Sequence, residues 1–342
     1  MAAPARHVRI VVIGTTSAGK STLTNALLGR WLLPSGVQEV TRAAVRVRHS
    51  RRADLRKMRT ARGTPRFFSS DAAVRRALGA TLQAPGSAIS LDVFIVRVPV
   101  CDGRTGDDAV RHAIVTRPGA SVALVDCPGL RSASDAVRLA ELRRACRAGH
   151  VVVLLLSAEE TDPTKDRLLI EAVLRPIADG ALSARRAIFV LSRFDAFERD
   201  DDPMRAVETA EMDRVREIRR MAASLRPGWR LGRLDVLGVA PRAALIAEAL
   251  GVGAPWLDHA DRAALEEELE TVAMRFVPWV RDLPRRCSRW STESYAQVIR
   301  DLRVASGMAD LLNAIRRAVR DVERPPARRL YRQKPVSGAG SR

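Results

Sequence analysis

Nine residues near the N-terminus have the types and order of a phosphate-binding loop. Residues 14–22 read GTTSAGKST, a complete match to GxxxxGK[ST], and they directly follow the apolar run of residues 8–13. A buried strand that ends in a glycine-rich turn and opens a helix directs backbone N–H groups at phosphate oxygens, which argues against a chance occurrence of the string. We therefore expect a nucleotide-binding loop formed by Gly14, Thr15, Thr16, Ser17, Ala18, Gly19, Lys20, Ser21 and Thr22.

Two side chains of this loop carry specific chemistry. The Lys20 ammonium is expected to reach the β- and γ-phosphates, and the Ser21 hydroxyl is expected to bind Mg²⁺. A second motif, DCPG, occupies residues 126–129 after the apolar run SVALV. An aspartate at the end of such a strand holds Mg²⁺ through water, and a glycine N–H contacts the γ-phosphate, so we assign these roles to Asp126 and Gly129. An ordinary turn is the alternative, and the preceding GKST loop favours the switch.

Base recognition is expected after a third apolar run, at residues 187–191 (AIFVL), which leads into Ser192, Arg193 and Asp195. The pattern that reads guanine at such a position is [NT]KxD. The Asp195 carboxylate can accept from both N1–H and N2–H of guanine, whereas adenine has no matching pair of donors. Arg193 replaces the lysine and can stack on the base through its guanidinium plane. Strict selectivity for guanine stays open, and residues 240–242 match the loop beneath the base only weakly.

Apolar runs of strand length alternate with amphipathic segments over most of the chain. This alternation predicts an α/β fold, a P-loop fold with a mostly parallel sheet and helices on both faces, followed by a C-terminal helical extension. The expected strands are residues 8–13, 89–98, 121–125, 151–156, 187–191 and 234–239. The expected helices are residues 71–81, 132–147, 164–177, 204–225, 259–279 and 294–322.

The formal charge of +19 is concentrated in two clusters. Residues 42–66 hold ten Lys or Arg against one acid, and residues 324–342 hold six basic residues and no acid. Such clusters attract anionic lipid or nucleic acid, while a solvated face and a disordered tail are the alternatives. The four cysteines have no metal-site spacing, and neither a signal peptide nor a membrane-spanning run is evident. We expect a cytoplasmic protein that can lie peripherally at the inner face of a membrane.

Residues 25–49 read NALLGRWLLPSGVQEVTRAAVRVRH and, with SAGKST, resemble the GTPase domain of the dynamin superfamily, above all its bacterial members. The resemblance covers roughly residues 8–250, and the segment 33–42 is its most specific part. It implies that Thr41 binds Mg²⁺ and helps to hold the attacking water, and that Ser17 binds a charge-compensating cation or touches the leaving oxygens. Thr16 stands where eukaryotic dynamins have a glutamine that orients this water. Arg42 and Arg131 are candidate substitutes, with surface salt bridges as the alternative for both.

The same resemblance implies an organisation and a function. We expect a dynamin-type GTPase domain at residues 1–254, a helical extension at 255–323 with a closing helix near 306–322, and a basic disordered tail at 324–342. The expected activity is Mg²⁺-dependent GTP hydrolysis, activated by pairing of two GTPase domains in a homodimer. Any membrane role would need an anionic membrane at the basic tail or a stalk-bearing partner protein.

Two other functions stay open. The first is a P-loop GTPase associated with RNA or the ribosome, which also carries GKST and DxPG. The absence of a recognisable RNA-binding module or interleaved aromatic pattern makes nucleic acid the less expected partner. The second is a non-hydrolysing GTP-dependent switch or scaffold, suggested by Thr16 and by the Ser192–Arg193 pair.

Overall fold

Nine strands of the described chain form one sheet. The computed structural model describes residues 7–35, 43–49, 55–61, 63–82, 89–93, 121–193, 203–229, 231–232, 234–251 and 257–323. The strand order in this sheet is β4-β3-β5-β2-β6-β1-β7-β8-β9. The strands are β1 (His7–Gly14), β2 (Val45–His49), β3 (Arg56–Thr60), β4 (Arg66–Phe67), β5 (Ile89–Val93), β6 (Ser121–Asp126), β7 (Val151–Ser157), β8 (Ala187–Ser192) and β9 (Val236–Val239).

The strands from β6 to β9 in this order all run parallel to one another. At the other end of the sheet, β2 is antiparallel to β6, and β3 is antiparallel to both β5 and β4. Parallel strands place their carboxyl ends at one edge of the sheet, where ligands of open α/β sheets bind. The carboxyl ends of β1, β6 and β8, where the three motifs begin, therefore lie at this edge. The mostly parallel α/β fold predicted from the sequence is confirmed.

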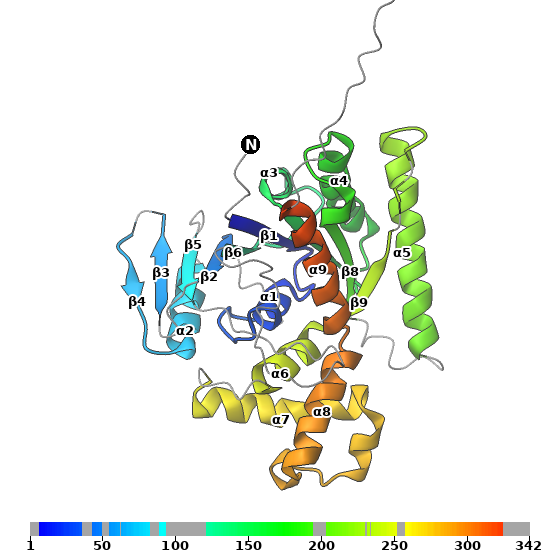
Figure 1. Ribbon diagram of the computed structural model, residues 1–342. Helices are drawn as coiled ribbons and strands as arrows, with labels where there is room; N and C mark the ends of the chain where they lie inside the picture. The colour runs from blue at the N-terminus through cyan, green and yellow to red at the C-terminus, as the bar shows by residue number, and fades with distance from the viewer. Residues whose placement is uncertain are drawn as a thin grey trace, which may run out of the picture.

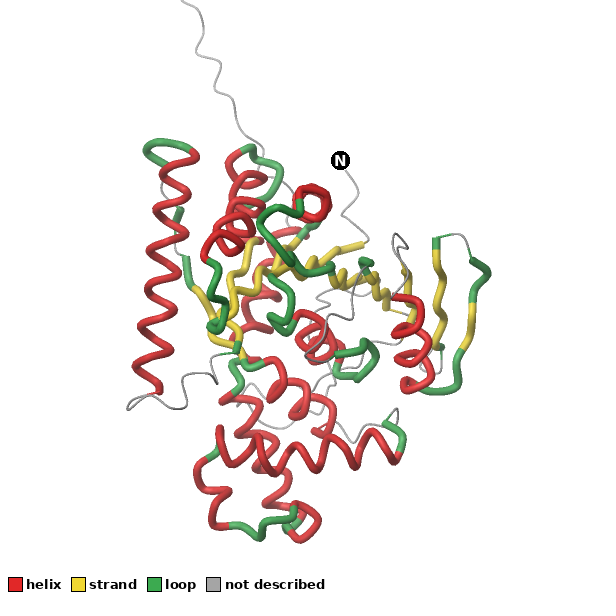
Figure 2. The backbone as a smooth tube through the Cα atoms, turned by 180° about the vertical axis from the view of Figure 1, so that it is seen from behind, coloured by secondary structure: helices red, strands yellow, loops and turns green. Residues whose placement is uncertain are grey.

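Helices cover both faces of the parallel part (Figures 1 and 2). One apolar core joins the sheet to α1 (Lys20–Leu28), α2 (Asp71–Leu82), α6 (Pro241–Gly251) and α9 (Met308–Glu323). A second core lies on the opposite face, beneath α3 (Ala136–Ala148), α4 (Pro163–Ala178) and α5 (Pro203–Leu225). All seven residues of β7 are buried between the two layers, as expected for a continuous apolar run in a parallel sheet.

The C-terminal helices extend the first layer. Helices α7 (His259–Phe276) and α8 (Thr292–Ala305) pack against α6, and the short 3-10 helices η3 (Pro278–Asp282) and η4 (Cys287–Arg289) connect them. Another 3-10 helix, η1 (Ala184–Arg186), precedes β8 and contacts α9. The apolar core is continuous from the sheet into α7, α8 and α9.

Helix α9 returns to the sheet through a close backbone contact. The Ala240 N–H donates to the Ser306 carbonyl at 3.0 Å, and Gly307, at φ +72°, lies against β9 immediately before α9. A Cβ atom at Gly307 would lie 1.9 Å from the Gly238 carbonyl oxygen. Only a glycine therefore allows α9 to approach β9 this closely.

Several element boundaries differ from the sequence expectation. Helix α3 begins at residue 136 instead of 132, because the Asp135 side chain accepts from the Arg138 N–H at 3.0 Å and caps the helix there. The single span 294–322 is two helices that break at Ser306 and Gly307. Strands β2, β3 and β4 were not expected within the basic cluster at residues 42–66. None of the helices in the described residues is long and apolar enough to cross a membrane.

Candidate nucleotide-binding site

The phosphate-binding loop connects β1, which lies between β6 and β7, to the first turn of α1. The backbone turns sharply through left-handed conformations at Ser17 (φ 64°) and Gly19 (φ 85°), and α1 begins at Lys20. The helix has no side-chain cap hydrogen bond and no acidic residue in its first turn. Uncapped N–H groups at a positive helix end attract an anion, so the local structure fits a phosphate.

The Lys20 side chain folds back along this loop. Its Nζ donates to the Thr15 carbonyl oxygen at 2.6 Å, and the residue is only 6% exposed. Burial lowers the pKa of Lys20, while the nearby Asp126 carboxylate acts in the opposite direction. A cation held in a loop of N–H donors, close to an apolar core, interacts strongly with a phosphate because water does not screen it.

Asp126 and Ser21 come together from different parts of the chain. Asp126 ends β6 in register with Val12 of β1, and the Ser21 hydroxyl donates to its Oδ2 at 2.7 Å. The residue is 1% exposed, and burial raises the pKa of Asp126 to about 6 against the opposing effects of Lys20 and Ser21. Its Oδ1 is buried without a hydrogen-bond partner in the described structure.

This pair fits a hard cation. Mg²⁺ takes oxygen ligands from a few carboxylates and hydroxyls together with phosphates and water. An unpartnered buried carboxylate oxygen beside a serine hydroxyl is such a donor set. Burial disfavours the charged form of Asp126 and so raises its pKa, and a bound cation would compensate this negative charge. The predicted metal ligands Ser21 and Asp126 are therefore adjacent, while the third, Thr41, lies outside the described residues.

The DCPG segment is bonded to the phosphate-binding loop by backbone hydrogen bonds. The Leu130 N–H donates to the Gly14 carbonyl at 3.2 Å, and the Thr16 N–H donates to the Leu130 carbonyl at 3.1 Å. A Cβ atom at Gly129 would lie 2.7 Å from the backbone nitrogen of Thr16 and 2.8 Å from Lys20 Nζ. Gly129 therefore lies beside Lys20, the residue predicted to bind the β- and γ-phosphates.

Thr16 and Cys127 are fixed in this segment. The Thr16 hydroxyl donates to the Leu130 carbonyl at 3.4 Å. Cys127 is buried, and burial raises the pKa of its thiol well above the ordinary range, which disfavours the nucleophilic thiolate form. Among the two arginines considered as substitutes for a catalytic glutamine, Arg131 is exposed and Arg42 lies outside the described residues.

The expected base-binding end begins where β8 ends. The Ser192 hydroxyl donates to the Leu156 carbonyl at 3.3 Å inside the sheet. Arg193 follows in a left-handed conformation (φ 58°), and its Nη1 donates to the Ser17 carbonyl at 3.2 Å. Its Nε lies 2.7 Å from Glu159 Oε2. Arg193 thus joins β8 to the phosphate-binding loop, and Asp195 lies outside the described residues.

Two contacts of the loop were not predicted from the sequence. Glu159 follows β7, the neighbour of β8, so strand pairing brings it to Arg193. Pro241 begins α6 and lies against Gly19, where a Cβ atom would be 3.0 Å from Pro241 Cγ. The weak match at residues 240–242 had placed this segment near the nucleotide, but nothing in the sequence indicated a contact with the loop.

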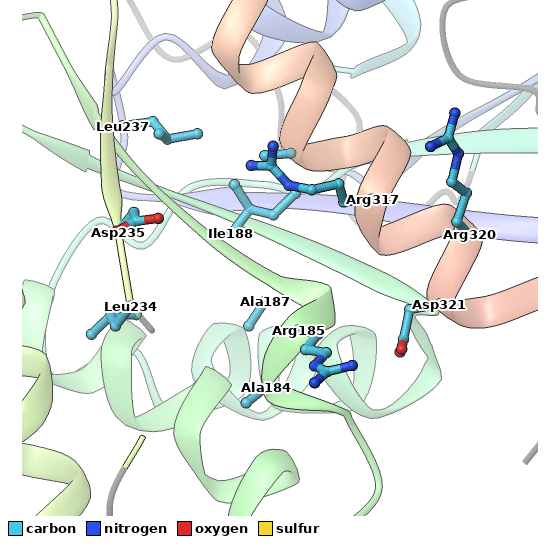
Figure 3. A pocket seen from close by; sticks show the side chains of 11 residues that line it. Ala184, Arg185, Ala187, Ile188, Leu234, Asp235, Leu237, Arg317, Arg320 and Asp321 are labelled. Carbon is cyan, nitrogen blue, oxygen red and sulfur yellow. The ribbon is translucent and has the colours of Figure 1, made fainter. Parts of the chain in front are cut away.

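A separate pocket of about 560 Å³ lies at the amino end of β8, away from the site residues (Figure 3). Apolar side chains of β8, β9 and α9 form its floor, including Ile188 and Leu237, and Arg317 and Arg320 of α9 line one side. None of the predicted site residues lines this pocket.

A parallel sheet, a GKST loop on its central strand and an aspartate at the end of the adjacent strand define a P-loop nucleotide-binding protein. The model of the dynamin family matches residues 10–193. The chain therefore belongs to the dynamin family, whose members are GTPases that bind GTP.

A search of solved structures finds an oligomerised bacterial dynamin pair, described as a mechanism for long-range sensing and tethering of membranes. The match has 13% sequence identity and a TM-score of 0.44, and it covers 92% of this chain and 40% of that one. The chain therefore spans about two fifths of that structure's chain. No curated protein matches the sequence.

Proposed function

We propose that this protein hydrolyses GTP in a Mg²⁺-dependent reaction at the loop of residues 14–22. The observation that carries the proposal is the Ser21–Asp126 pair, whose buried Oδ1 has no partner in the described structure, beside Lys20 at the start of α1. Family membership supports GTP as the nucleotide.

Each residue has a stated role in this proposal. Lys20 and the N–H groups of residues 14–22 bind the phosphates and stabilise the negative charge that develops on the γ-phosphoryl group. Ser21 and Thr41 would hold Mg²⁺ directly and Asp126 would hold it through water, and the ion would neutralise negative charge on the phosphates. Thr41 helps to hold the attacking water, and the Gly129 N–H contacts the γ-phosphate. Ser17 binds a charge-compensating cation or touches the leaving oxygens. Water attacks the γ-phosphorus, the bond to the β–γ bridging oxygen breaks, and GDP and phosphate are released.

Selectivity for guanine is assigned to the Asp195 carboxylate, and Arg193 lies along the base. The bond from Arg193 to the Ser17 carbonyl supports this placement, because it fixes the arginine beside the loop.

The proposed protein acts as a homodimer through residues 1–254, with 255–323 as a helical extension and 324–342 as a basic tail. Membrane association through an anionic surface, or through a partner that carries a stalk, belongs to the same proposal. Threonine is shorter than the glutamine that orients water in eukaryotic dynamins, and the Thr16 hydroxyl donates to the Leu130 carbonyl. We therefore assign no water-orienting role to Thr16. Dimerisation then becomes the route to a fast reaction, and a non-hydrolysing switch is the competing function.

The test is phosphate release from GTP and from ATP over a protein concentration series, for the wild type, Lys20→Ala and Ser21→Ala. Arg147→Ala, which removes a surface ion pair at the end of α3, is the control. We expect hydrolysis of GTP alone, a rate per chain that rises with concentration, and a loss of about 100-fold or more in Lys20→Ala. Ser21→Ala should shift the Mg²⁺ dependence to higher concentration while it retains binding of a fluorescent GTP analogue.

Three outcomes contradict the proposal. Equal turnover of ATP would remove the role given to Asp195. A rate per chain that is independent of concentration would exclude activation by dimerisation. Nucleotide binding without phosphate release in a single-turnover experiment at high protein concentration would leave the non-hydrolysing switch.

A further inference from the structure

The far end of the sheet from the parallel strands has one buried face and one open face. On β2, β3 and β5 the buried face carries Val45, Val47, Met58, Ile89, Leu91 and Val93, which pack in the core with α2. Residues at the alternate positions point to the other face, because side chains alternate along a strand. Figure 1 shows these strands and α2 at one end of the molecule.

Strand register places four cations on the open face in two rows. One row runs across β2, β5 and β3 as Arg46, Ser90 and Arg59. The next row runs as Arg48, Asp92 and Lys57, and continues to Phe67 on β4. We call Arg46, Arg48, Lys57, Arg59 and Phe67 the basic sheet face.

The cover provided by α3 stops at β6. Val125 on β6 packs against the core beneath α3, α4 and α5, whereas its register partner Arg46 on β2 is exposed. Arg59 is also exposed, and Lys57 is half-buried. The basic sheet face is therefore accessible from solvent.

Among the described residues, ion pairing on this face is confined to Arg48 and Asp92. Arg48 forms a two-pronged ion pair with Asp92, at 2.7 Å from Nε and 3.0 Å from Nη2. In the part of the chain that the structure describes, no ion pair is formed by Arg46, Lys57 or Arg59. Three cations thus remain available to a polyanion.

An aromatic ring borders these cations. Phe67 is 67% exposed on the edge strand β4, and Lys57 Nζ lies 6.0 Å from the centre of its ring. A large exposed aromatic side chain is unfavourable in water and offers a flat surface on which a base can stack. Strand pairing, not sequence spacing, brings Phe67 beside the cations. For this reason the sequence shows no interleaving of aromatic and basic residues.

We propose that the basic sheet face binds single-stranded nucleic acid, with phosphates at Arg46, Lys57 and Arg59 and a base stacked on Phe67. Cations beside an aromatic ring on a sheet provide the two interactions that hold a single strand without strong sequence preference. Adjacent strands of a sheet rotate by about 20° relative to one another, so the cations lie on a twisted surface. A flexible strand can follow that surface, whereas a planar bilayer touches only part of it. This inference does not depend on GTP hydrolysis.

The test is fluorescence anisotropy of labelled 20-nucleotide oligo(U) and oligo(dT) with the full chain, over a salt series. The matched variants are Arg46→Gln/Arg59→Gln and Arg317→Gln/Arg320→Gln, which remove equal charge from exposed arginines of the basic sheet face and of α9. Both retain the basic tail. We expect the first double variant to weaken binding about 25-fold at 0.1 M salt and to reduce the slope of log K against log salt by about 1.4. Phe67→Ala should weaken binding about fivefold or more with an unchanged slope.

Thermal unfolding of each variant controls for folding, and all substituted side chains are exposed. Equal losses in the two double variants would show binding by overall charge and overturn the proposal. A second outcome would also overturn the proposal. In it, the protein binds vesicles that contain anionic phosphatidylglycerol, Phe67→Ala loses this binding, and the oligonucleotides do not bind. No oligonucleotide binding at low salt would leave the basic sheet face as a solvated surface. A difference between oligo(U) and oligo(dT) would identify RNA or DNA as the ligand.

Discussion

At the level of single residues, the site depends on how closely Gly129 approaches the phosphate-binding loop. Its α-carbon lies beside Thr16 and Lys20, which are more than one hundred positions earlier in the chain. A Cβ atom on residue 129 would meet the Cα and N atoms of Thr16. Both are backbone atoms, which cannot rotate away as a flexible side chain would.

We expect Gly129→Ala to reduce the affinity for a fluorescent GTP analogue by at least about tenfold, because the methyl group must displace the loop or the Lys20 ammonium. Gly79→Ala is the control, since a Cβ atom there has nothing within 4 Å and lies in α2. This control should retain affinity and gain about 0.5–1 kcal/mol in stability. Equal affinities in the two variants would show that Gly129 does not border the nucleotide.

A second residue-scale prediction concerns Asp166 in the first turn of α4. The side chain is buried, Arg214 Nη2 lies 2.7 Å from Oδ2, and neither oxygen has an aligned hydrogen bond in the described structure. Burial raises the pKa of Asp166 to about 6, against the opposing effect of Arg214. The folded state therefore holds this proton more tightly than the unfolded state, and the resulting stability is lost as pH rises through about 6.

Between pH 5 and pH 7.5, the wild type should lose about 1.4 kcal/mol more free energy of unfolding than Asp166→Asn, which has no such proton. Urea denaturation at several pH values measures this difference. Asp213→Asn, at an exposed ion pair with Arg216, should follow the wild type. If the profiles of the wild type and Asp166→Asn are parallel, Asp166 has no raised pKa.

At the level of elements, α9 is held over the sheet by contacts at both ends. Its first residue follows Gly307, which lies against the Gly238 carbonyl, and Asp321 near its end pairs with Arg186 of η1 at 2.7 Å. Between these contacts, α9 contributes Leu311, Ile315 and Val319 to the core. Because Ala240 and Pro241 follow β9 directly, the start of α9 also lies near the segment that contacts Gly19.

We expect Gly307→Ala to reduce the free energy of unfolding by about 2 kcal/mol more than Gly180→Ala. Both glycines have positive φ, +72° and +74°, so the conformational cost of about 1–2 kcal/mol is common to both. Only at Gly307 does the added Cβ atom overlap a backbone oxygen, whereas Gly180 has nothing within 4 Å. Chemical denaturation checks the difference, and similar losses would mean that α9 does not dock closely on β9.

At the level of the whole molecule, the helical extension and the sheet share one apolar core. Leu265 and Leu269 of α7 belong to the same cluster as Leu245 of α6 and Val153 of β7. The Trp31 ring, just after α1, contacts two arginines. Its centre lies 4.3 Å from Cζ of Arg75 in α2 and 5.1 Å from Cζ of Arg242 in α6. Arg75 pairs with Asp261 of α7, and Arg242 pairs with Glu268 of the same helix. The proposed boundary near residue 254 therefore divides the sequence without dividing the core.

We expect a single unfolding transition for the described fold. Tryptophan fluorescence, which reports partly on Trp279 and Trp290 beside α7 and α8, should change at the same denaturant concentration as far-ultraviolet circular dichroism. A GTP analogue should shift both curves together. Two separate transitions would show that residues 255–323 unfold independently of the sheet.

The sequence by itself determined the features that depend on local order along the chain. Residues 14–22 specify a phosphate-binding loop because the glycines, lysine and serine must be consecutive to direct donors at one phosphate group. The apolar runs predicted β6, β7 and β8, since buried parallel strands need continuous apolar residues. The resemblance in residues 25–49 predicted the family, and the match over residues 10–193 confirms it.

The tertiary structure decided which distant residues meet. Strand order places Asp126 beside Ser21 and Glu159 beside Arg193, and no local pattern contains this pairing. Strands β2 and β3 were missed because their exposed positions are arginines and lysine, which conceal the alternation with buried residues such as Val45, Val47 and Met58. Strand β4 was missed because its two residues are both exposed and form no alternation. The basic sheet face arises in the same way, because hydrogen bonds between separate strands bring its cations together with Phe67.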